Sequence, residues 1–107
     1  MTFEGQYLTY EEYIELGGSE EMGETPFNLL EFKSRRMIDI ETFGRLKSLE
    51  KQPEEIKDCM FDLIETIEYD TLYKDAKAED KEKYIHSIII SHLTGVIING
   101  EHILYRG

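Results

Sequence analysis

Hydrophobic residues recur at intervals of three and four positions along much of this chain, which is the spacing of one face of an α-helix. The clearest run follows Pro53, a residue that suits the first turn of a helix because it lacks a backbone N–H. Its apolar positions are Ile56, Cys59, Met60, Leu63, Ile64 and Ile67. The pattern predicts a well-defined amphipathic helix that starts at Gln52-Pro53.

A shorter helix is predicted near the N-terminus, between Thr9 and Gly17-Gly18. Glu12 follows Thr9 at the spacing of a capping box, in which each side chain accepts a hydrogen bond from the other residue's backbone N–H. Glycines end helices readily because they adopt left-handed backbone conformations without strain. The acidic residues from 19 to 24 then predict a loop.

Another helix is predicted from Thr25-Pro26, with Thr25 as the N-cap, to Gly44. Apolar residues mark two sides of this helix. They are Phe27, Leu30, Met37 and Ile38 on one side and Leu29, Phe32, Ile40 and Phe43 on the other. So wide an apolar arc predicts a helix that is packed between two others.

The C-terminal third of the chain predicts a further helix and a hairpin. Apolar residues from Tyr84 to Leu93 follow the helical spacing, whereas the charged residues 74–83 fit either a solvated helix or a loop. Asn99-Gly100 lies between two apolar runs, a strong hairpin signal. The chain is therefore predicted to be one domain over residues 1–107. Its expected class is all-α, a small bundle of about four helices with an extended or hairpin C-terminal segment.

The net charge of the chain limits the kinds of partner that it can bind. The 107 residues include 12 Lys and Arg against 23 Asp and Glu, a formal net charge of −11. A field of that sign repels nucleic acid and anionic membranes, so a face that grips DNA phosphates is not expected. No signal peptide is predicted, and the longest apolar run, residues 88–90, is too short to span a bilayer. Cys59 has no second cysteine to pair with, and we expect a cytoplasmic protein.

No catalytic, metal or cofactor site is predicted. His86 and His92 are six residues apart, which places them on different faces of a helix, and Cys59 belongs to the apolar side of another helix. Residues 70–80 are acidic but lack the central glycine of a calcium-binding EF-hand loop. No serine lies in a Gly-x-Ser-x-Gly context. The sequence indicates a protein that binds other proteins and is not an enzyme.

One charge pattern is a candidate binding site. Glu54, Asp58, Asp62 and Glu65 form an acidic stripe along one predicted helix, at a spacing where like charges cost a few tenths of a kcal/mol each. The densest basic cluster is Lys33, Arg35 and Arg36 on another helix. The two sets either form ordinary solvated surface or join the stripe of one copy to the cluster of the next. A head-to-tail contact of the second kind would generate a ring or a filament.

Several short segments, taken in order, carry a resemblance to a known family. They are residues 7–13 (YLTYEEY), 16–18 (LGG), 27–28 (FN), 30–32 (LEF), 35–39 (RRMID), 42–46 (TFGRL), 53–57 (PEEIK), 59–64 (CMFDLI) and 104–107 (LYRG). In this series the chain resembles the head–tail connector proteins of tailed bacteriophages and related prophages. It departs from them between residues 70 and 85, where the family's usual Ser-, Gly- and Asp-rich loop is replaced by Lys and Glu.

The resemblance implies a structural virion protein without a cofactor. Copies would self-associate into a ring beneath the portal protein and join the DNA-filled head to a tail or stopper protein. Relatives are often monomers before assembly. DNA would pass nearby without specific binding, and no membrane is involved. The expected locations are the host cytoplasm during assembly and the neck of the virion.

The C-terminal residues Ile103, Leu104, Tyr105 and Arg106 are candidates for an anchor on a neighbouring protein, because an apolar chain end is normally covered by something. The domain's own core is an equally good cover. An alternative function from another class is a small acidic regulatory protein, such as a DNA mimic, that binds a basic partner. A DNA mimic would spread carboxylates over a whole face.

Overall fold

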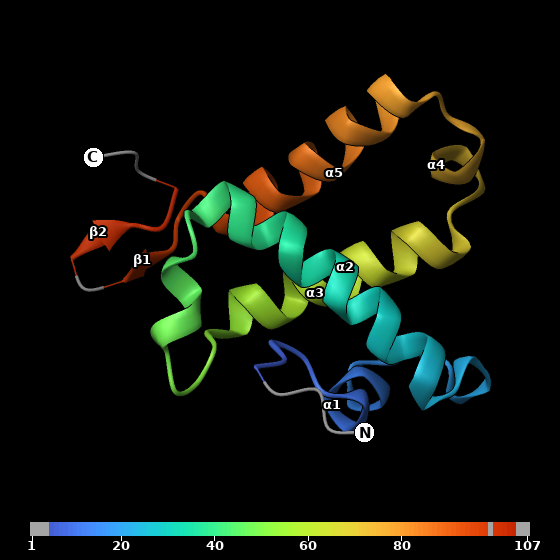
Figure 1. Ribbon diagram of the computed structural model, residues 1–107, viewed down its shortest axis with the longest axis horizontal. Coiled ribbons are helices and arrows are strands. Elements are labelled where there is room, and N and C mark those ends of the chain that lie inside the picture. Colours follow the sequence, from blue (N-terminus) through green and yellow to red (C-terminus); the bar gives the residue numbers. More distant parts are fainter. Residues whose placement is uncertain (1–4, 99, 105–107) are drawn as a thin grey trace.

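The computed structural model describes residues 5–98 and 100–104. This part of the chain is mostly helical and ends in a short antiparallel hairpin, as the sequence predicted (Figure 1). Long helices form the body, and short helices and turns connect them. In chain order the elements are α1 (Tyr10–Glu15), the 3₁₀ turn η1 (Glu20–Met22), α2 (Glu24–Thr42), the 3₁₀ turn η2 (Arg45–Ser48), α3 (Glu54–Tyr69), α4 (Thr71–Asp75), α5 (Ala78–Leu93), β1 (Ile97–Ile98) and β2 (Glu101–His102).

The predicted capping box sets the start of α1. The Thr9 hydroxyl accepts a hydrogen bond from the Glu12 N–H at 3.1 Å, and the Glu12 carboxylate accepts one from the Thr9 N–H at 3.0 Å. The helix ends where Gly17 takes a φ of +108°, a conformation that costs glycine little. Both ends of α1 are therefore fixed by local signals, and both predictions are confirmed.

The predicted N-cap of α2, Thr25, is wrong by two positions. The helix begins at Glu24, so Thr25 lies inside its first turn and Gly23 occupies the cap position. Gly23 joins η1 to α2 with a φ of +82°, a backbone conformation that glycine adopts without strain. Its carbonyl accepts the N–H of Phe27 at 3.2 Å. At the other end the chain leaves the helix at Phe43 and Gly44, close to the predicted stop.

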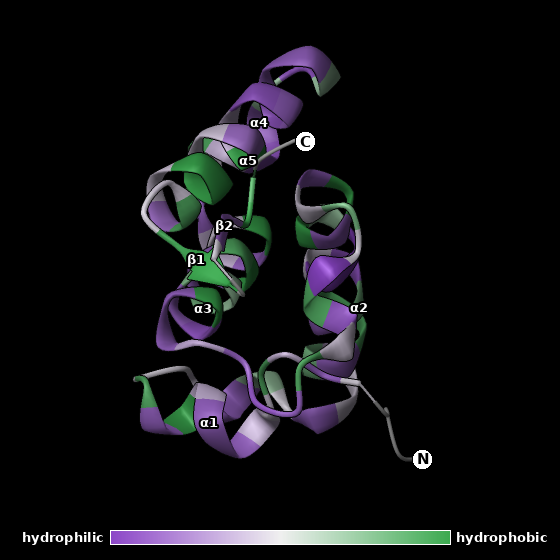
Figure 2. Cartoon of the chain, turned by 90° about the vertical axis from the view of Figure 1, so that its left-hand side faces the viewer, coloured by the Kyte–Doolittle hydropathy of each residue, from purple (hydrophilic) through white to green (hydrophobic). Residues whose placement is uncertain are grey.

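Only one side of α2 is covered by the described chain. Its inner side packs against α3 and also approaches α5, which both lie on the same side of α2 (Figure 2). On the outer side, Leu29, Phe32, Ile40 and Phe43 are exposed by 57, 45, 73 and 46%. The prediction that α2 is packed between two helices is wrong, because periodicity reports apolar positions and not what covers them.

The core is completed by α3 and α5, which make the most extensive helix–helix contact of the described chain. The buried positions on α3 are Ile56, Cys59, Met60, Leu63 and Ile64, and those on α5 are Ile85, Ile89 and Leu93. The charged residues 70–83 are largely helical, the first part forming α4 and the last part the start of α5. Asp70 caps α4 by accepting the Tyr73 N–H, and α5 begins at Ala78.

The predicted hairpin is confirmed and closes one end of the molecule. Ile97 pairs with His102 and Ile98 with Glu101. The Ile103 N–H then donates to the Val96 carbonyl at 3.0 Å, and both of these side chains are buried. The hairpin therefore returns the chain to the core through Ile103.

Replacing Ser34 tests whether the inner side of α2 is buried as the structure shows. Its side chain is fully buried, and its hydroxyl has no hydrogen-bond partner among the described residues. An unpaired buried hydroxyl costs roughly 1–3 kcal/mol. We expect Ser34→Ala to raise the free energy of unfolding by about 1 kcal/mol, measured by urea denaturation. Ser87→Ala, at an exposed position of α5, is the matched control for helix propensity. Equal changes in the two variants would contradict the expectation.

Candidate protein-interaction surfaces

The acidic stripe lies on the outer side of α3, opposite the residues that α3 buries. Glu54 and Asp58 are exposed and form no ion pair with any described residue. Asp62 contacts Nε2 of His92 at 2.6 Å, and Glu65 accepts a hydrogen bond from the Tyr13 hydroxyl at 3.2 Å. Partial burial raises the pKa of Glu65 above its ordinary value. Glu54 and Asp58 are thus the members most available to a partner.

The structure separates the predicted basic cluster into two parts. Lys33 and Arg36 are exposed on the outer side of α2, and Arg36 lies over the ring of Phe32 at 5.8 Å. Arg35 also lies over the Phe32 ring, at 5.4 Å, but it bonds within its own chain. Its guanidinium pairs with Glu31 at 3.2 Å and donates to the Gly5 carbonyl at 3.1 Å. Arg35 therefore holds the N-terminal segment in place within its own chain.

Lys33 and Arg36 share their side of α2 with the exposed apolar residues. We call this surface the outer face of α2. It consists of Leu29, Phe32, Lys33, Arg36, Ile40 and Phe43. A surface of large apolar side chains together with an arginine is typical of protein-binding sites. The sequence pattern picked out the apolar members but assigned them to packing within the domain.

The outer face of α2 and the acidic stripe of α3 point in opposite directions. Each helix turns its inner side to the shared core, so the opposite sides of the two helices face away from each other. Figure 2 shows α2 on one side of the molecule and α3 on the other. One copy therefore presents a basic, apolar face in one direction and an acidic face in the other.

The burial of Glu31 is not predicted by the sequence, because charged residues are usually exposed. Its side chain is fully buried on the inner side of α2, and one carboxylate oxygen accepts the backbone N–H of Tyr7 at 2.9 Å. Burial raises the pKa of Glu31, while the Tyr7 N–H and the Arg35 guanidinium oppose that rise. The available signal was its spacing, since residue 31 lies four positions after Phe27, on the same helix face.

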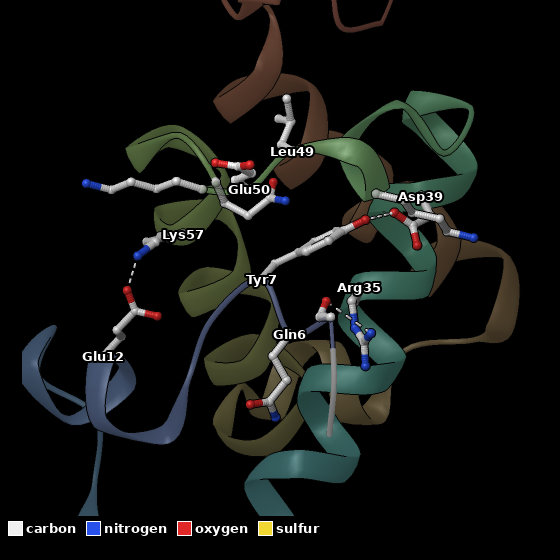
Figure 3. A pocket seen from close by; sticks show the side chains of 12 residues that line it. Gln6, Tyr7, Glu12, Arg35, Asp39, Leu49, Glu50 and Lys57 are labelled. Carbon is white, nitrogen blue, oxygen red and sulfur yellow. Dashed lines mark hydrogen bonds and ion pairs between the residues drawn. The ribbon is translucent and has the colours of Figure 1, made fainter. Parts of the chain in front are cut away.

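A polar cleft of about 530 Å³ lies between the N-terminal segment, α2, residues 47–52 and α3. Figure 3 shows the ion pair of Lys57 with Glu12 on one side and the hydrogen bond from Tyr7 to Asp39 on the other. Lys47 and Lys51 also line it. We call this surface the cationic cleft. Sequence reasoning missed it because its residues come from five separate segments, namely residues 5–7, α1, α2, residues 47–52 and α3.

An apolar groove of about 600 Å³ separates part of α2 from α5. Met37, Ile40, Ile85 and Ile89 are among the residues that line it. At one place it is bridged by Nδ1 of His86, which lies 3.0 Å from a carboxylate oxygen of Glu41. The two histidines of α5 thus contact different helices, His86 reaching α2 and His92 reaching α3.

The core contains one thiol among the described residues, that of Cys59. Cys59 is buried, and this burial raises the pKa of its thiol to about 12, so the reactive thiolate is not formed near neutral pH. Among residues 5–98 and 100–104, no three His, Cys, Asp or Glu side chains are grouped as metal ligands. None of the helices described is both long and apolar enough to cross a membrane.

The C-terminal candidates have different positions. Ile103 is 1% exposed and belongs to the core of its own chain, which is the second of the two covers considered above. Leu104 is half-buried against that core. Tyr105 and Arg106 lie outside the described residues. Within the described chain, the C-terminal segment therefore contributes to internal packing.

Comparison with known proteins finds no match among family models, curated proteins or solved structures. The resemblance to head–tail connectors therefore stays a prediction from the sequence. The two oppositely charged faces and the cationic cleft stand on the geometry of this chain alone.

Proposed function

We propose that this chain is a structural adaptor protein of a tailed phage or prophage, and that its copies join head to tail into a ring beneath the portal. The outer face of α2 in one copy would contact the acidic stripe of α3 in the next. The observation that carries this proposal is the opposite direction of these two faces, whose charges are complementary. A contact between different faces repeats from copy to copy, and it closes into a ring when the rotation allows.

The composition of the outer face of α2 suits such a contact. Four large apolar side chains are between 45 and 73% exposed there, and burying them against a neighbour would supply the free energy of association. Arg36 and Lys33 would select the acidic face, because complementary charges steer partners and exclude wrong ones. The apolar and the charged residues thus have separate roles in the same surface.

Arg36 also argues against a two-fold dimer through α2. Phe32 and Ile40 lie four residues on either side of Arg36, and Leu29 and Phe43 lie seven residues away. An antiparallel pairing of two α2 helices about this midpoint would match the apolar residues but place Arg36 against Arg36. Like charges at the centre of a contact are unfavourable. An acidic partner face removes that conflict.

The rest of the chain fits a position near DNA. Residues 33–52 hold six basic and three acidic residues, a formal charge of +3, which leaves −14 for the remainder. A strongly negative surface repels the phosphate backbone, so DNA would pass such a ring without being held. The remaining partners in this proposal are the portal on one side and a tail or stopper protein on the other.

Charge exchange between copies tests the head-to-tail contact. Arg36→Glu alone and Asp58→Arg alone should each weaken self-association at least tenfold, about 1.4 kcal/mol. An equimolar mixture of the two variants should restore it, because each altered face meets its complement. Mass by light scattering, with and without the portal protein at low salt, measures both effects.

Lys77→Glu and Glu79→Arg are the matched controls. Both residues are exposed, and neither belongs to the outer face of α2 or to the acidic stripe. Single variants that assemble as the wild type does would show that the stripe is only solvated surface. A one-to-one complex with a basic protein, in place of a ring with the portal, would favour the alternative of an acidic regulatory protein.

A further inference from the structure

We propose that Phe43 is the anchor of the contact between copies, and that its ring packs on the neighbouring α3 next to Asp58. This inference rests on the proposed function and deepens it, because it names the side chain that contributes most to the contact. Three features of Phe43 carry it, namely a left-handed backbone, a half-exposed ring and a hollow beside that ring.

The backbone of Phe43 is left-handed. Its φ of 57° is the one positive value at a non-glycine position among the described residues. Side chains as large as phenylalanine rarely adopt this conformation, because Cβ comes too close to a carbonyl oxygen. The residue that ends a helix in this way is usually glycine or asparagine. Phenylalanine here costs folding free energy, and such strain is characteristic of positions where a side chain has a function.

The core of the domain does not use the ring of Phe43. The residue is 46% exposed and lies outside the hydrophobic core. The Arg45 guanidinium lies over the ring, 5.3 Å from its centroid. Arg45 in turn donates hydrogen bonds to the carbonyls of His102 and Ile103, at 3.0 and 3.4 Å. A half-exposed ring that is supported in this way is held ready for a partner, which lowers the cost of ordering it on binding.

A shallow hollow of about 390 Å³ lies beside the ring. Phe43 and Gly44 are both left-handed, and the turn that they form brings Lys47 back next to α2. Ile40 and Phe43 line the hollow with apolar surface, while Arg36 and Lys47 line it with positive charge. An aromatic side chain and an arginine around one hollow are typical of the residues that dominate a protein–protein contact.

The charge of this hollow favours an acidic partner. Among the described residues, the one carboxylate in its lining is Asp39, which accepts a hydrogen bond from the Tyr7 hydroxyl. With Asp39 counted as charged, Arg36 and Lys47 still leave the hollow net positive. A carboxylate that enters it next to the Phe43 ring would balance that charge.

The acidic stripe of a second copy supplies such a carboxylate. Asp58 is exposed and forms no ion pair with any described residue, whereas Asp62 already contacts His92. Asp58 would therefore meet the cations of the hollow, and the surface of α3 around it would cover the Phe43 ring. Complementary charge selects the partner, and burial of the ring supplies the free energy.

The other apolar members of the outer face of α2 do not combine these features. Leu29 is half-exposed, but it lies within the regular helix and carries no backbone strain. Phe32 lies against the guanidiniums of Arg35 and Arg36, at 5.4 and 5.8 Å. At Phe43 alone among these three apolar residues, a large side chain is kept against the preference of its own backbone.

Two substitutions separate the strain of Phe43 from its contact. Phe43→Asn and Phe43→Ala both remove the ring, so each should weaken self-association about tenfold or more, measured by light scattering at low salt. Asparagine tolerates the left-handed conformation better than alanine does, so Phe43→Asn should have the higher urea midpoint. Equal losses of association in two folded variants of different stability would show that the ring acts in the contact and not through folding.

The comparison variants are Leu16→Ala and Leu29→Ala. Leu16 is 42% exposed, close to the value for Phe43, and belongs to neither face, so its replacement should change association by less than about twofold. Leu29→Ala, on the same face as Phe43, should cost less association than Phe43→Ala. Combining Phe43→Asn with Asp58→Ala should lose less than the product of the two single losses, because residues that meet across a contact are coupled.

The outcomes distinguish this inference from the proposed function. If the charge variants of Arg36 and Asp58 act and rescue each other as expected, but Phe43→Ala costs no more than Leu29→Ala, Phe43 is not the anchor and the head-to-tail contact stands. If Phe43→Ala weakens association while the charge variants do not, the head-to-tail pairing fails and Phe43 anchors a contact of another kind. Independent losses at Phe43 and Asp58 would refute their contact. Wild-type protein that stays monomeric with and without the portal protein would overturn both proposals.

Discussion

Replacing Glu31 by alanine is expected to lower the free energy of unfolding by about 3 kcal/mol. The Glu31 carboxylate is fully buried and accepts the Tyr7 N–H while pairing with the Arg35 guanidinium. Alanine would leave the buried Tyr7 N–H without its acceptor, and it would remove the carboxylate partner of Arg35, whose guanidinium keeps its bond to the Gly5 carbonyl. Urea denaturation followed by circular dichroism measures the loss.

Two variants separate the role of Glu31 from a general loss of charge. Glu31→Gln keeps an oxygen that can accept the Tyr7 N–H, so it should lose less stability than alanine does. Glu55→Ala removes a carboxylate from an exposed position in the first turn of α3 and should change the free energy of unfolding by under about 0.5 kcal/mol. A Glu31→Ala protein as stable as Glu55→Ala would refute the importance of this contact.

The pH dependence of stability gives an independent signature of Glu31. Burial raises its pKa in the folded protein, so the native carboxyl takes up a proton more readily than the unfolded one. Stability contributed by this group therefore increases as the pH falls through the native pKa toward the unfolded value of about 4.3, and decreases as the pH rises. Relative to Glu31→Gln, the wild type should gain stability as the pH is lowered from neutrality toward about 4.3.

Local signals in the sequence were enough to predict much of the fold. The capping box of Thr9 and Glu12, the stop at Gly17 and the hairpin at Gly100 each depend on neighbours within a few residues. The start of α2 was misplaced because Thr25-Pro26 is also an acceptable first turn. Gly23 competes with that signal through a φ of +82°, which only the folded path of the chain requires.

The outer face of α2 shows where such reasoning stops. Ile40 and Ile38 are equally apolar, yet Ile40 is 73% exposed and Ile38 is fully buried. Helical periodicity puts them on different sides but cannot say whether the second side is covered by the same chain. The width of the apolar arc was therefore real evidence for a partner, and the error was to place that partner inside the domain.

The candidate sites divide in the same way. The acidic stripe was predictable because its spacing is a property of a single helix. Arg35 was grouped with Arg36 because they are adjacent in sequence, although adjacent residues of a helix point in directions about 100° apart. The cationic cleft depends on tertiary contacts that place Lys47, Lys51 and Lys57 in the lining of one cleft, and no local sequence pattern predicts it.

Gly18→Ala is expected to lower the free energy of unfolding by about 3 kcal/mol. A Cβ atom at this position would overlap the ring of Tyr13. Tyr13 cannot retreat, because it is fully buried between Phe27 and Phe61, with ring centroids 5.0 and 5.4 Å away. Its hydroxyl is also held by Glu65. The clash must therefore displace α1 from α2 and α3, which the near-ultraviolet tyrosine signal and urea denaturation would both report.

A second-site change identifies the cause of the Gly18→Ala effect. In a Tyr13→Leu background the ring is absent, so adding Gly18→Ala should cost far less than it does in the wild type, a coupling expected for residues in contact. Gly95→Ala is the control for backbone effects, because a Cβ there meets nothing within 4 Å and Gly95 does not have a left-handed φ. It should leave stability unchanged or slightly raised. If Gly18→Ala lowered the free energy of unfolding equally in the wild type and in Tyr13→Leu, the cost would arise from the backbone at Gly18 and not from a clash with the Tyr13 ring.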